Sequence, residues 1–195
     1  MATMTRADAL QQLGNHMIPP EMAKGLLHPL RFLVERPKKQ LARVVRPGDT
    51  VVELGCGSGY FTRYLSHMVG AQGRVIAVDV QPDMLSVARA YINGKAGPGR
   101  IDYHLSANGT LGLELSNADT VVLIHTLHEA AGTETFLAET VALLRSSGRL
   151  LFMEPKIEVP PDLFAWEIKL LEEAGLTKES TFTSLFGRGA VFGKP

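Results

Sequence analysis

The stretch "TVVELGCGSGYFTRYL", residues 50–65, places three glycines within five positions, between an apolar run and a helical pattern. The run "TVVEL" is typical of a buried strand, and "YFTRYLSHMV" repeats its apolar side chains at helical spacing. A glycine-rich turn from a strand into a helix lets a ligand approach free backbone N–H groups, which suit a phosphate or a carboxylate. A phosphate and a carboxylate in this place indicate different classes of enzyme.

Strands and helices alternate after residue 50. Further strand patterns are "RVIAVDV", "IDYHL", "ADTVVLIHT" and "RLLFMEP", and helical patterns are "PDMLSVARAYIN", "TETFLAETVALLR" and "PPDLFAWEIKLLEEAG". Leu137, Val141 and Leu144 share one face of the second of these helices, and we expect Gly148 to end it. The tail predicts two strands around a turn at Gly187–Gly189 without a helix between them, hence an antiparallel pair. We expect an α/β fold with a seven-stranded, mostly parallel sheet that has one antiparallel strand and helices on both faces.

The composition places limits on the function. The 195 residues include 20 Lys and Arg against 20 Asp and Glu, which argues against strong overall attraction to nucleic acid or an anionic membrane and leaves a local basic patch open. No apolar run approaches the ~20 residues of a membrane span. The single cysteine, Cys56, can form no intrachain disulfide, and the N-terminus lacks an apolar signal core. We therefore expect a cytoplasmic protein.

The chain is expected to form one compact unit in two parts. Residues 1–48 are Pro-punctuated and predict a helical segment, and residues 49–195 carry the strand and helix alternation. The N-terminal segment has two interpretations, namely a lid over the bound ligand or helices that simply cover the sheet. As a lid it would offer substrate contacts from Met17, Met22, Leu26, Leu27 and Phe32.

The glycine spacing favours an amino-acid ligand over a phosphate. A dinucleotide motif reads G-x-G-x-x-G, whereas Gly55, Gly57 and Gly59 follow G-x-G-x-G, and Tyr60 stands at the last glycine position of that motif. The carboxylate of Glu53 repels a phosphate but suits an ammonium, while the loop N–H groups suit a carboxylate. S-adenosylmethionine carries both groups. The alternative is that the glycines mark only a tight turn.

A second acidic residue supports this ligand. Asp79 ends the strand "RVIAVDV", twenty residues after Gly59, where a carboxylate can accept both ribose hydroxyls. Met84 follows in the next helix and could lie against an adenine, because its side chain is soft and unbranched.

The motifs "VVELGCGSGYFT", "VIAVDVQPDML" and "ADTVVLIHTLHE" resemble the successive motifs of class I S-adenosylmethionine-dependent methyltransferases, over about Thr50 to Pro155. The nearest groups are the ubiquinone/menaquinone-type and general small-molecule enzymes. The resemblance implies a Rossmann-like fold and methyl transfer from S-adenosylmethionine to oxygen or carbon, rather than nitrogen, of a small molecule, leaving S-adenosylhomocysteine. It also implies a donor site made of Glu53, Gly55, Cys56, Gly57, Gly59, Tyr60, Asp79, Val80, Met84, Asn108 and His125.

Within that donor site Asn108 departs from the family pattern. The family often places an acidic residue there to meet the adenine amino group, and an amide oxygen can accept the same hydrogen bond. Cys56 is interpreted as a small residue that fills the loop rather than as a nucleophile.

The run "LHE" at residues 127–129 is similar to the leucine-histidine-acid run of small-molecule O-methyltransferases, in which that histidine is the general base. The resemblance implies His128 as base, with Glu129 raising its pKa or orienting it. The alternative is a structural or pocket-lining histidine. His125 and His128 could share a helical face, but no third metal ligand is visible and Glu129 is expected to point away, so no metal site is predicted.

Two other functions stay open. A domain that binds the methyl donor could act as a sensor or assembly factor without catalysis. An NAD-dependent oxidoreductase is the alternative enzyme, and Tyr60 in place of the last glycine counts against it. The oligomeric state is left open, with a homodimer as one option.

Overall fold

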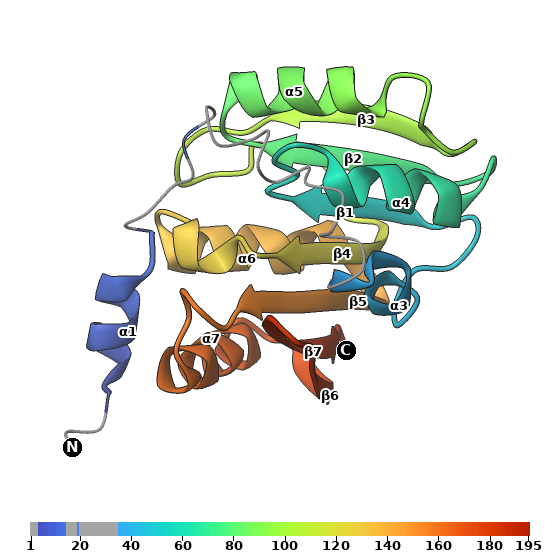
Figure 1. Ribbon diagram of the computed structural model, residues 1–195. Coiled ribbons are helices and arrows are strands. Elements are labelled where there is room, and N and C mark those ends of the chain that lie inside the picture. Colours follow the sequence, from blue (N-terminus) through green and yellow to red (C-terminus); the bar gives the residue numbers. More distant parts are fainter. Residues whose placement is uncertain (1–3, 15–18, 20–34) are drawn as a thin grey trace.

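Seven strands form one sheet at the centre of the protein (Figure 1). The computed structural model describes residues 4–14, 19 and 35–195. The strands are β1 (Thr50–Leu54), β2 (Arg74–Asp79), β3 (Arg100–Leu105), β4 (Ala118–Ile124), β5 (Leu144–Pro155), β6 (Thr177–Thr183) and β7 (Gly187–Gly193). Their order is β3-β2-β1-β4-β5-β7-β6, and β7 is antiparallel to both of its neighbours. The predicted fold is confirmed.

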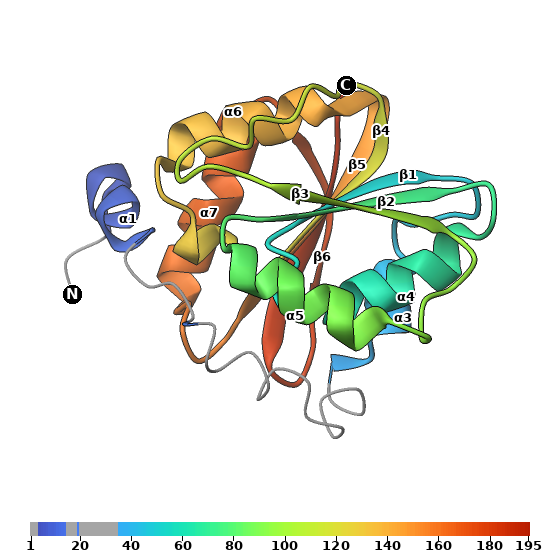
Figure 2. The same cartoon turned by 90° about the horizontal axis from the view of Figure 1, so that it is seen from above.

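Helices cover both faces of the sheet (Figure 2). The described helices are α1 (Arg6–Gln12), α3 (Pro37–Leu41), α4 (Tyr60–Val69), α5 (Pro82–Ile92), α6 (Thr133–Leu143) and α7 (Pro161–Glu173), and a 3-10 turn, η3, spans Leu127–Glu129. α3, α4 and α5 lie on one face, and α6 and α7 lie on the other. Pro82 and Pro161 each occupy the first position of a helix, where a missing N–H costs nothing.

The strand order reverses between β1 and β4. From β1 the chain builds outward through β2 and β3, and it then returns to the other side of β1 as β4. Because β1 and β4 are parallel, with Leu54 beside Leu123, both strands end at the same edge of the sheet. The segments after them lead to helices on opposite faces, which leaves a crevice at this edge. Open α/β sheets bind their ligands in such a crevice.

Burial explains why the central strands are apolar runs rather than alternating patterns. β1 is buried after Thr50 and β2 is buried after Arg74. Both faces of these strands are covered by helices, so both sets of side chains must be apolar. The edge strand β3 is largely half-buried, which accounts for its weaker sequence pattern.

The boundary between α6 and β5 differs from the sequence prediction. α6 ends at Leu143, and Leu144 already has extended backbone and pairs with Ala118 of β4. Leu144 continues the apolar helical spacing, which is why the sequence pattern extends the helix past it. Lys194, near the far end of the chain, donates through Nζ to the carbonyls of Val141 and Leu144 at 2.8 and 2.6 Å. This tertiary contact satisfies carbonyl groups at the end of α6.

The N-terminal segment is described in part. α1 begins with a capping box at Thr5, and the indole of Trp166 on α7 donates to the carbonyl of Met4 at 2.9 Å, which attaches α1 to α7. The predicted lid contacts lie outside the described residues: Met17, Met22, Leu26, Leu27 and Phe32. The lid therefore stays a prediction. Among the helices of the described residues, none combines the length and apolar character that crossing a membrane requires.

A carboxyl group interrupts the buried face of α7. Glu167 is fully buried, and neither of its carboxyl oxygens has a hydrogen-bond partner among the described residues. Burial, reinforced by the charge of Glu154, raises the pKa of Glu167 from 4.5 to about 10. The folded protein therefore keeps a proton on Glu167 at neutral pH.

This proton makes stability depend on pH. Because the unfolded chain releases the proton above pH 4.5 and the folded protein keeps it to about pH 10, Glu167 lowers the free energy of unfolding as pH rises between these values. The slope is at most about 1.4 kcal/mol per pH unit. Glu167→Met removes the group, so urea unfolding at pH 5 and pH 8 should show a smaller loss of stability than in the wild type. Equal losses in the two proteins would show that Glu167 ionises normally.

Candidate active site

A cavity opens at the edge of the sheet where β1, β2 and β4 end. Its walls come from the glycine loop, the end of β2 with the start of α5, the loop after β3 and the segment after β4. Apolar lining includes Tyr60, Phe61, Met84, Leu111 and Phe136, and polar lining includes Asp79, Gln81, Asn108, Thr126 and Glu129. An apolar cavity with a few polar groups is typical of a small-molecule site.

Each glycine of the loop has its own structural reason. Gly55, Gly57 and Gly59 have φ values of 71°, 51° and 79°, a region that favours glycine. A Cβ on Gly55 would stand 2.4 Å from Oγ1 of Thr126, and a Cβ on Gly59 would stand 3.0 Å from the Cβ of Ala88 on α5. A Cβ on Gly57 would meet nothing within 4 Å, and this residue lines the cavity. The missing side chain at Gly57 leaves space for a ligand.

Asp79 joins the glycine loop to the end of β2. Its Oδ2 accepts from the N–H of Gly57 at 2.8 Å, and its Oδ1 accepts from the N–H of Gln81 at 2.9 Å. Burial raises the pKa of Asp79, and these backbone hydrogen bonds oppose the rise. Asp79 is nearly buried and still lines the cavity. A carboxylate offers about four lone-pair sites, so Asp79 can still accept a hydrogen bond from a ligand.

Glu53 lies behind the loop rather than at its mouth. The residue is 3% exposed, and its Oε2 accepts from the hydroxyl of Thr62 on α4 at 2.6 Å. Burial raises the pKa of Glu53 to about 8, with the Thr62 hydrogen bond opposing this rise and the charge of Asp79 adding to it. Glu53 is thus a buried group whose negative charge would be favoured by a nearby cation.

The structure brings most of the predicted donor-site residues together. Those that line the cavity are Gly55, Cys56, Gly57, Tyr60, Asp79, Val80, Met84, Asn108 and His125. Glu53 and Gly59 are not among the lining residues, because Glu53 bonds to Thr62 behind the loop and Gly59 packs on α5. Burial raises the pKa of the Cys56 thiol well above its ordinary value, which keeps the thiol protonated.

Sequence reasoning missed Thr126. The preceding residue, His125, has a φ of 56°, which is uncommon for a side chain other than glycine, and its N–H donates to the carbonyl of Met153 at 2.7 Å. The turn directs Thr126 toward β1, where its Oγ1 lies 3.1 Å from the carbonyl oxygen of Leu54 and 3.0 Å from that of Ile124. One hydroxyl therefore links the ends of β1 and β4. No local sequence pattern distinguishes such a threonine from any other, so sequence analysis could not find it.

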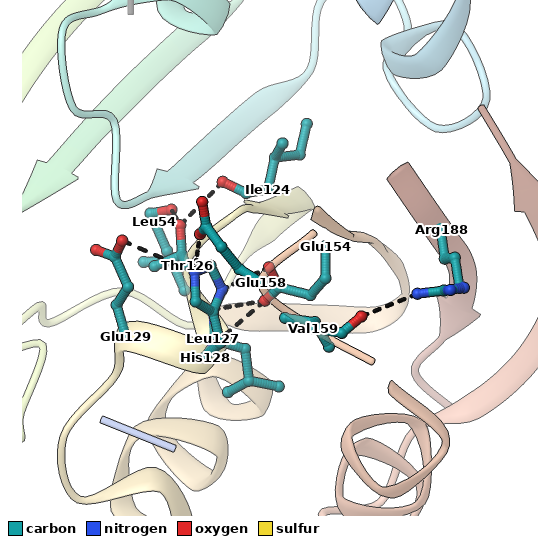
Figure 3. Close-up of polar contacts among 10 residues, drawn as sticks. All are labelled: Leu54, Ile124, Thr126, Leu127, His128, Glu129, Glu154, Glu158, Val159 and Arg188. Atoms are coloured by element: carbon teal, nitrogen blue, oxygen red, sulfur yellow. Dashed lines mark hydrogen bonds and ion pairs between the residues drawn. The ribbon is translucent and has the colours of Figure 1, made fainter. Parts of the chain in front are cut away.

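Three carboxylates surround the imidazole of His128 (Figure 3). Nδ1 lies 2.7 Å from Oε2 of Glu154, and Nε2 lies 3.0 Å from Oε2 of Glu158 and 3.8 Å from Oε1 of Glu129. Glu154, near the end of β5, is buried and also accepts from the N–H groups of Leu127 and His128 at 2.8 and 3.3 Å. These bonds fix the orientation of the ring.

The same contacts disfavour the predicted role of His128 as a general base. Burial by itself lowers the pKa of His128, but the hydrogen bond to Glu154 and the charges of Glu154, Glu129 and Glu158 raise it to about 9. A protonated imidazole has no lone pair with which to accept a proton at neutral pH. His128 is also not among the residues that line the cavity. The effect of Glu129 on this pKa agrees with the sequence expectation.

The sequence expectation that Glu129 points away from His128 is wrong. The 3-10 turn η3 keeps its carboxylate within 3.8 Å of the imidazole, and a third group, Glu158, arrives from the loop after β5. Glu154 could have been noticed, because an acidic side chain inside an apolar strand is rarely buried without a partner. Glu158 carries no such signal, since only the fold brings it to residues 30 positions earlier.

A family of known proteins matches the region that builds this site. The family described as methyltransferase domain matches residues 51–148, just over half of the chain. A solved S-adenosylmethionine-dependent methyltransferase from Aquifex aeolicus is similar, with a TM-score of 0.82 and 27% identity, over 92% of this chain and 100% of the other.

Two curated relatives carry the name ubiquinone/menaquinone biosynthesis C-methyltransferase UbiE. The relative from Shewanella piezotolerans is 26% identical over 141 residues, which cover 69% of this chain and 56% of the relative. The relative from Francisella tularensis subsp. novicida is 32% identical over 110 residues, which cover 56% and 44%. The chain thus spans about half the length of the curated relatives it matches.

The glycine loop gives a matched pair of variants. Gly55→Ala and Gly57→Ala both force alanine into a positive φ, which costs about 1–2 kcal/mol. Gly55→Ala additionally overlaps Thr126, so it should lose a further 1–3 kcal/mol or so of unfolding free energy. Urea denaturation of the two variants measures the difference. If both lose the same stability, the contact between positions 55 and 126 is not tight.

Proposed function

The chain belongs to the methyltransferase domain family, and we propose that it transfers a methyl group from S-adenosylmethionine to a small-molecule acceptor, releasing S-adenosylhomocysteine. The family and the fold agree with the resemblance seen in the sequence motifs. The observation that carries the proposal is the placement of Gly57 and Asp79. A loop position open to the cavity stands next to a nearly buried carboxylate that can accept further hydrogen bonds.

The cavity residues fit the parts of this donor. The N–H groups at the start of α4 suit a carboxylate, and Asp79 suits the ribose hydroxyls. Val80 and Met84 offer apolar contacts to an adenine, and the amide of Asn108 offers it an acceptor. Glu53 would act from behind the loop, through its charge and through the position of the backbone.

The donor, when bound, supplies a methyl group attached to a sulfonium. The task of the protein is then to hold the acceptor in line with that methyl group, and such positioning accounts for a large part of the rate. The acceptor would enter the cavity beside His125 and Glu129. Residues 49–195 would carry the donor site, and residues 1–48 with the loops after β4 and β5 would contact the acceptor.

Carbon is the acceptor atom that we propose. The curated relatives are named C-methyltransferases, and a carbon of an electron-rich aromatic ring can attack the methyl group first and lose its ring proton to water afterwards, so no strong base is needed nearby. His128 is protonated and bound to carboxylates, so an acceptor that needs deprotonation by this residue fits the site less well.

The first test of this function is donor binding. Calorimetric titration should show S-adenosylhomocysteine bound at one site and no binding of NAD. Binding of NAD alone would indicate an oxidoreductase. Binding of S-adenosylhomocysteine without turnover in a broad acceptor screen would favour the sensor.

Asp79 is the residue whose loss should weaken donor binding most clearly. Asp79→Ala should reduce affinity for S-adenosylhomocysteine more than tenfold, because hydrogen bonds to a charged acceptor contribute about 1.5–3 kcal/mol each. Asp83→Ala is the matched control, since Asp83 lies exposed in the first turn of α5 and does not line the cavity. Unfolding curves would show whether the variant loses stability because the hydrogen bond to Gly57 is missing. Unchanged affinity in a folded Asp79→Ala protein would refute the assignment.

The acceptor atom can be read from the product. With a ¹³C-labelled donor methyl group and a panel of hydroxylated aromatic acceptors, the product NMR spectrum distinguishes a methyl group on carbon from one on oxygen. We expect the carbon-bound signal. An oxygen-bound methyl group would overturn the choice of atom but not the methyltransferase activity.

A further inference from the structure

The cluster around His128 has the composition and spacing of a metal site. His128, Glu129 and Glu158 each offer a ligand atom, and these atoms all lie within 4.8 Å of one another. The three side chains come from η3 and from the loop after β5, two segments that follow neighbouring strands. Figure 3 shows the carboxylates of Glu129 and Glu158 on the side of the imidazole opposite Glu154.

The distances suit a first-row transition metal. Bonds of about 2.0–2.2 Å from a tetrahedral zinc ion to nitrogen and oxygen place two ligand atoms about 3.4 Å apart. Nε2 of His128 lies 3.0 Å from the Glu158 oxygen and 3.8 Å from the Glu129 oxygen, on either side of that value. Shifts of a few tenths of an ångström would therefore bring both oxygens to that distance from Nε2, and all three ligand atoms already lie within 4.8 Å of one another.

The buried carboxylate of Glu154 provides the support that a histidine ligand requires. Metal-binding imidazoles commonly use their second nitrogen to donate to a carboxylate, which fixes the tautomer and the ring orientation. Glu154 occupies this place at 2.7 Å from Nδ1, and the N–H of Leu127 holds it from the other side. Nε2 is thereby left facing Glu129 and Glu158.

The charges of the cluster also favour a cation that carries more than one positive charge. Within the described part of the chain, three carboxylates face one imidazole, and a divalent ion that replaces the proton on Nε2 would bring them more positive charge than that proton does. Arg188 lies apart from the carboxylates in Figure 3 and donates instead to the carbonyl of Val159 at 2.9 Å.

We infer that His128, Glu129 and Glu158 bind a divalent first-row transition metal ion such as Zn²⁺, with Glu154 as the positioning residue. A nitrogen ligand favours this class over Mg²⁺ and Ca²⁺, which prefer all-oxygen sites. Three protein ligands leave coordination positions open, as catalytic rather than structural zinc sites do.

The location gives the metal site a role in acceptor binding. Glu129 lines the cavity as well as the cluster, so a cation held there stands at the cavity rim. It would be placed to bind an oxygen atom of the acceptor. This role rests on the proposed function, whereas the metal site itself does not.

The test is titration of the tag-free, chelator-treated full chain with Zn²⁺ alone, followed by calorimetry. We expect one site, binding at least tenfold weaker in Glu158→Gln, and binding of Mg²⁺ at least tenfold weaker than Zn²⁺. Glu158 has a side chain that is 54% exposed, so its substitution should leave the fold intact. Glu172→Gln, an exposed glutamate that pairs with Lys178, is the matched control and should bind as the wild type does.

A second readout is the visible spectrum of Co²⁺, whose absorption reports an imidazole and carboxylate site of low coordination number. The spectrum should appear in the wild type and in Glu172→Gln and should be lost in Glu158→Gln. No binding of Zn²⁺, or equal binding by Glu158→Gln and the wild type, would show that the cluster is an ion-pair network. Because no methyl donor is present, a failure here is distinct from a failure of donor binding.

Discussion

The close approach of Gly55 to Thr126 is the constraint from which the site follows. At this point β1 and β4 end side by side and their continuations separate toward opposite faces of the sheet. The hydroxyl of Thr126 links the last carbonyls of the two strands and occupies the space where a Cβ of residue 55 would stand. The glycine is therefore required by packing as much as by its positive φ. The crevice between the separating segments becomes the cavity.

A single carboxylate connects this constraint to ligand chemistry. Asp79 holds the N–H of Gly57 and so fixes the loop, and it still presents lone pairs to the cavity. Asp79 would bind the ribose of the donor. It also shapes the glycine loop, and that loop would contact the methionine portion of the same donor. In the proposed function, donor recognition and local structure would be coupled through one side chain, because a buried carboxylate must satisfy several hydrogen bonds at once.

The opposite rim is organised by charge. Burying Glu154 beneath His128 needs a positive partner, and the imidazole provides it. Glu129 and Glu158 lie on the other ring nitrogen, Nε2, so three carboxylates surround one imidazole beside the cavity. The same carboxylates that make His128 a poor base at neutral pH would attract a cation to this place, and a bound metal ion would replace the proton on Nε2.

The sequence by itself determined the alternation of strands and helices, the glycine loop and the acid at the end of β2. These features depend on neighbours within one strand, one turn or one helix, so local patterns record them. Only the tertiary structure decided where α6 ends, because Lys194 satisfies its carbonyls from fifty residues away. Only the tertiary structure decided the contacts and the pKa of His128 too. Its partner Glu154 lies in β5 and its partner Glu158 follows that strand, and the pairing of β4 with β5 brings both to the ring. Local chemistry can be read along a chain, but the charge around a side chain is set by whatever the fold places beside it.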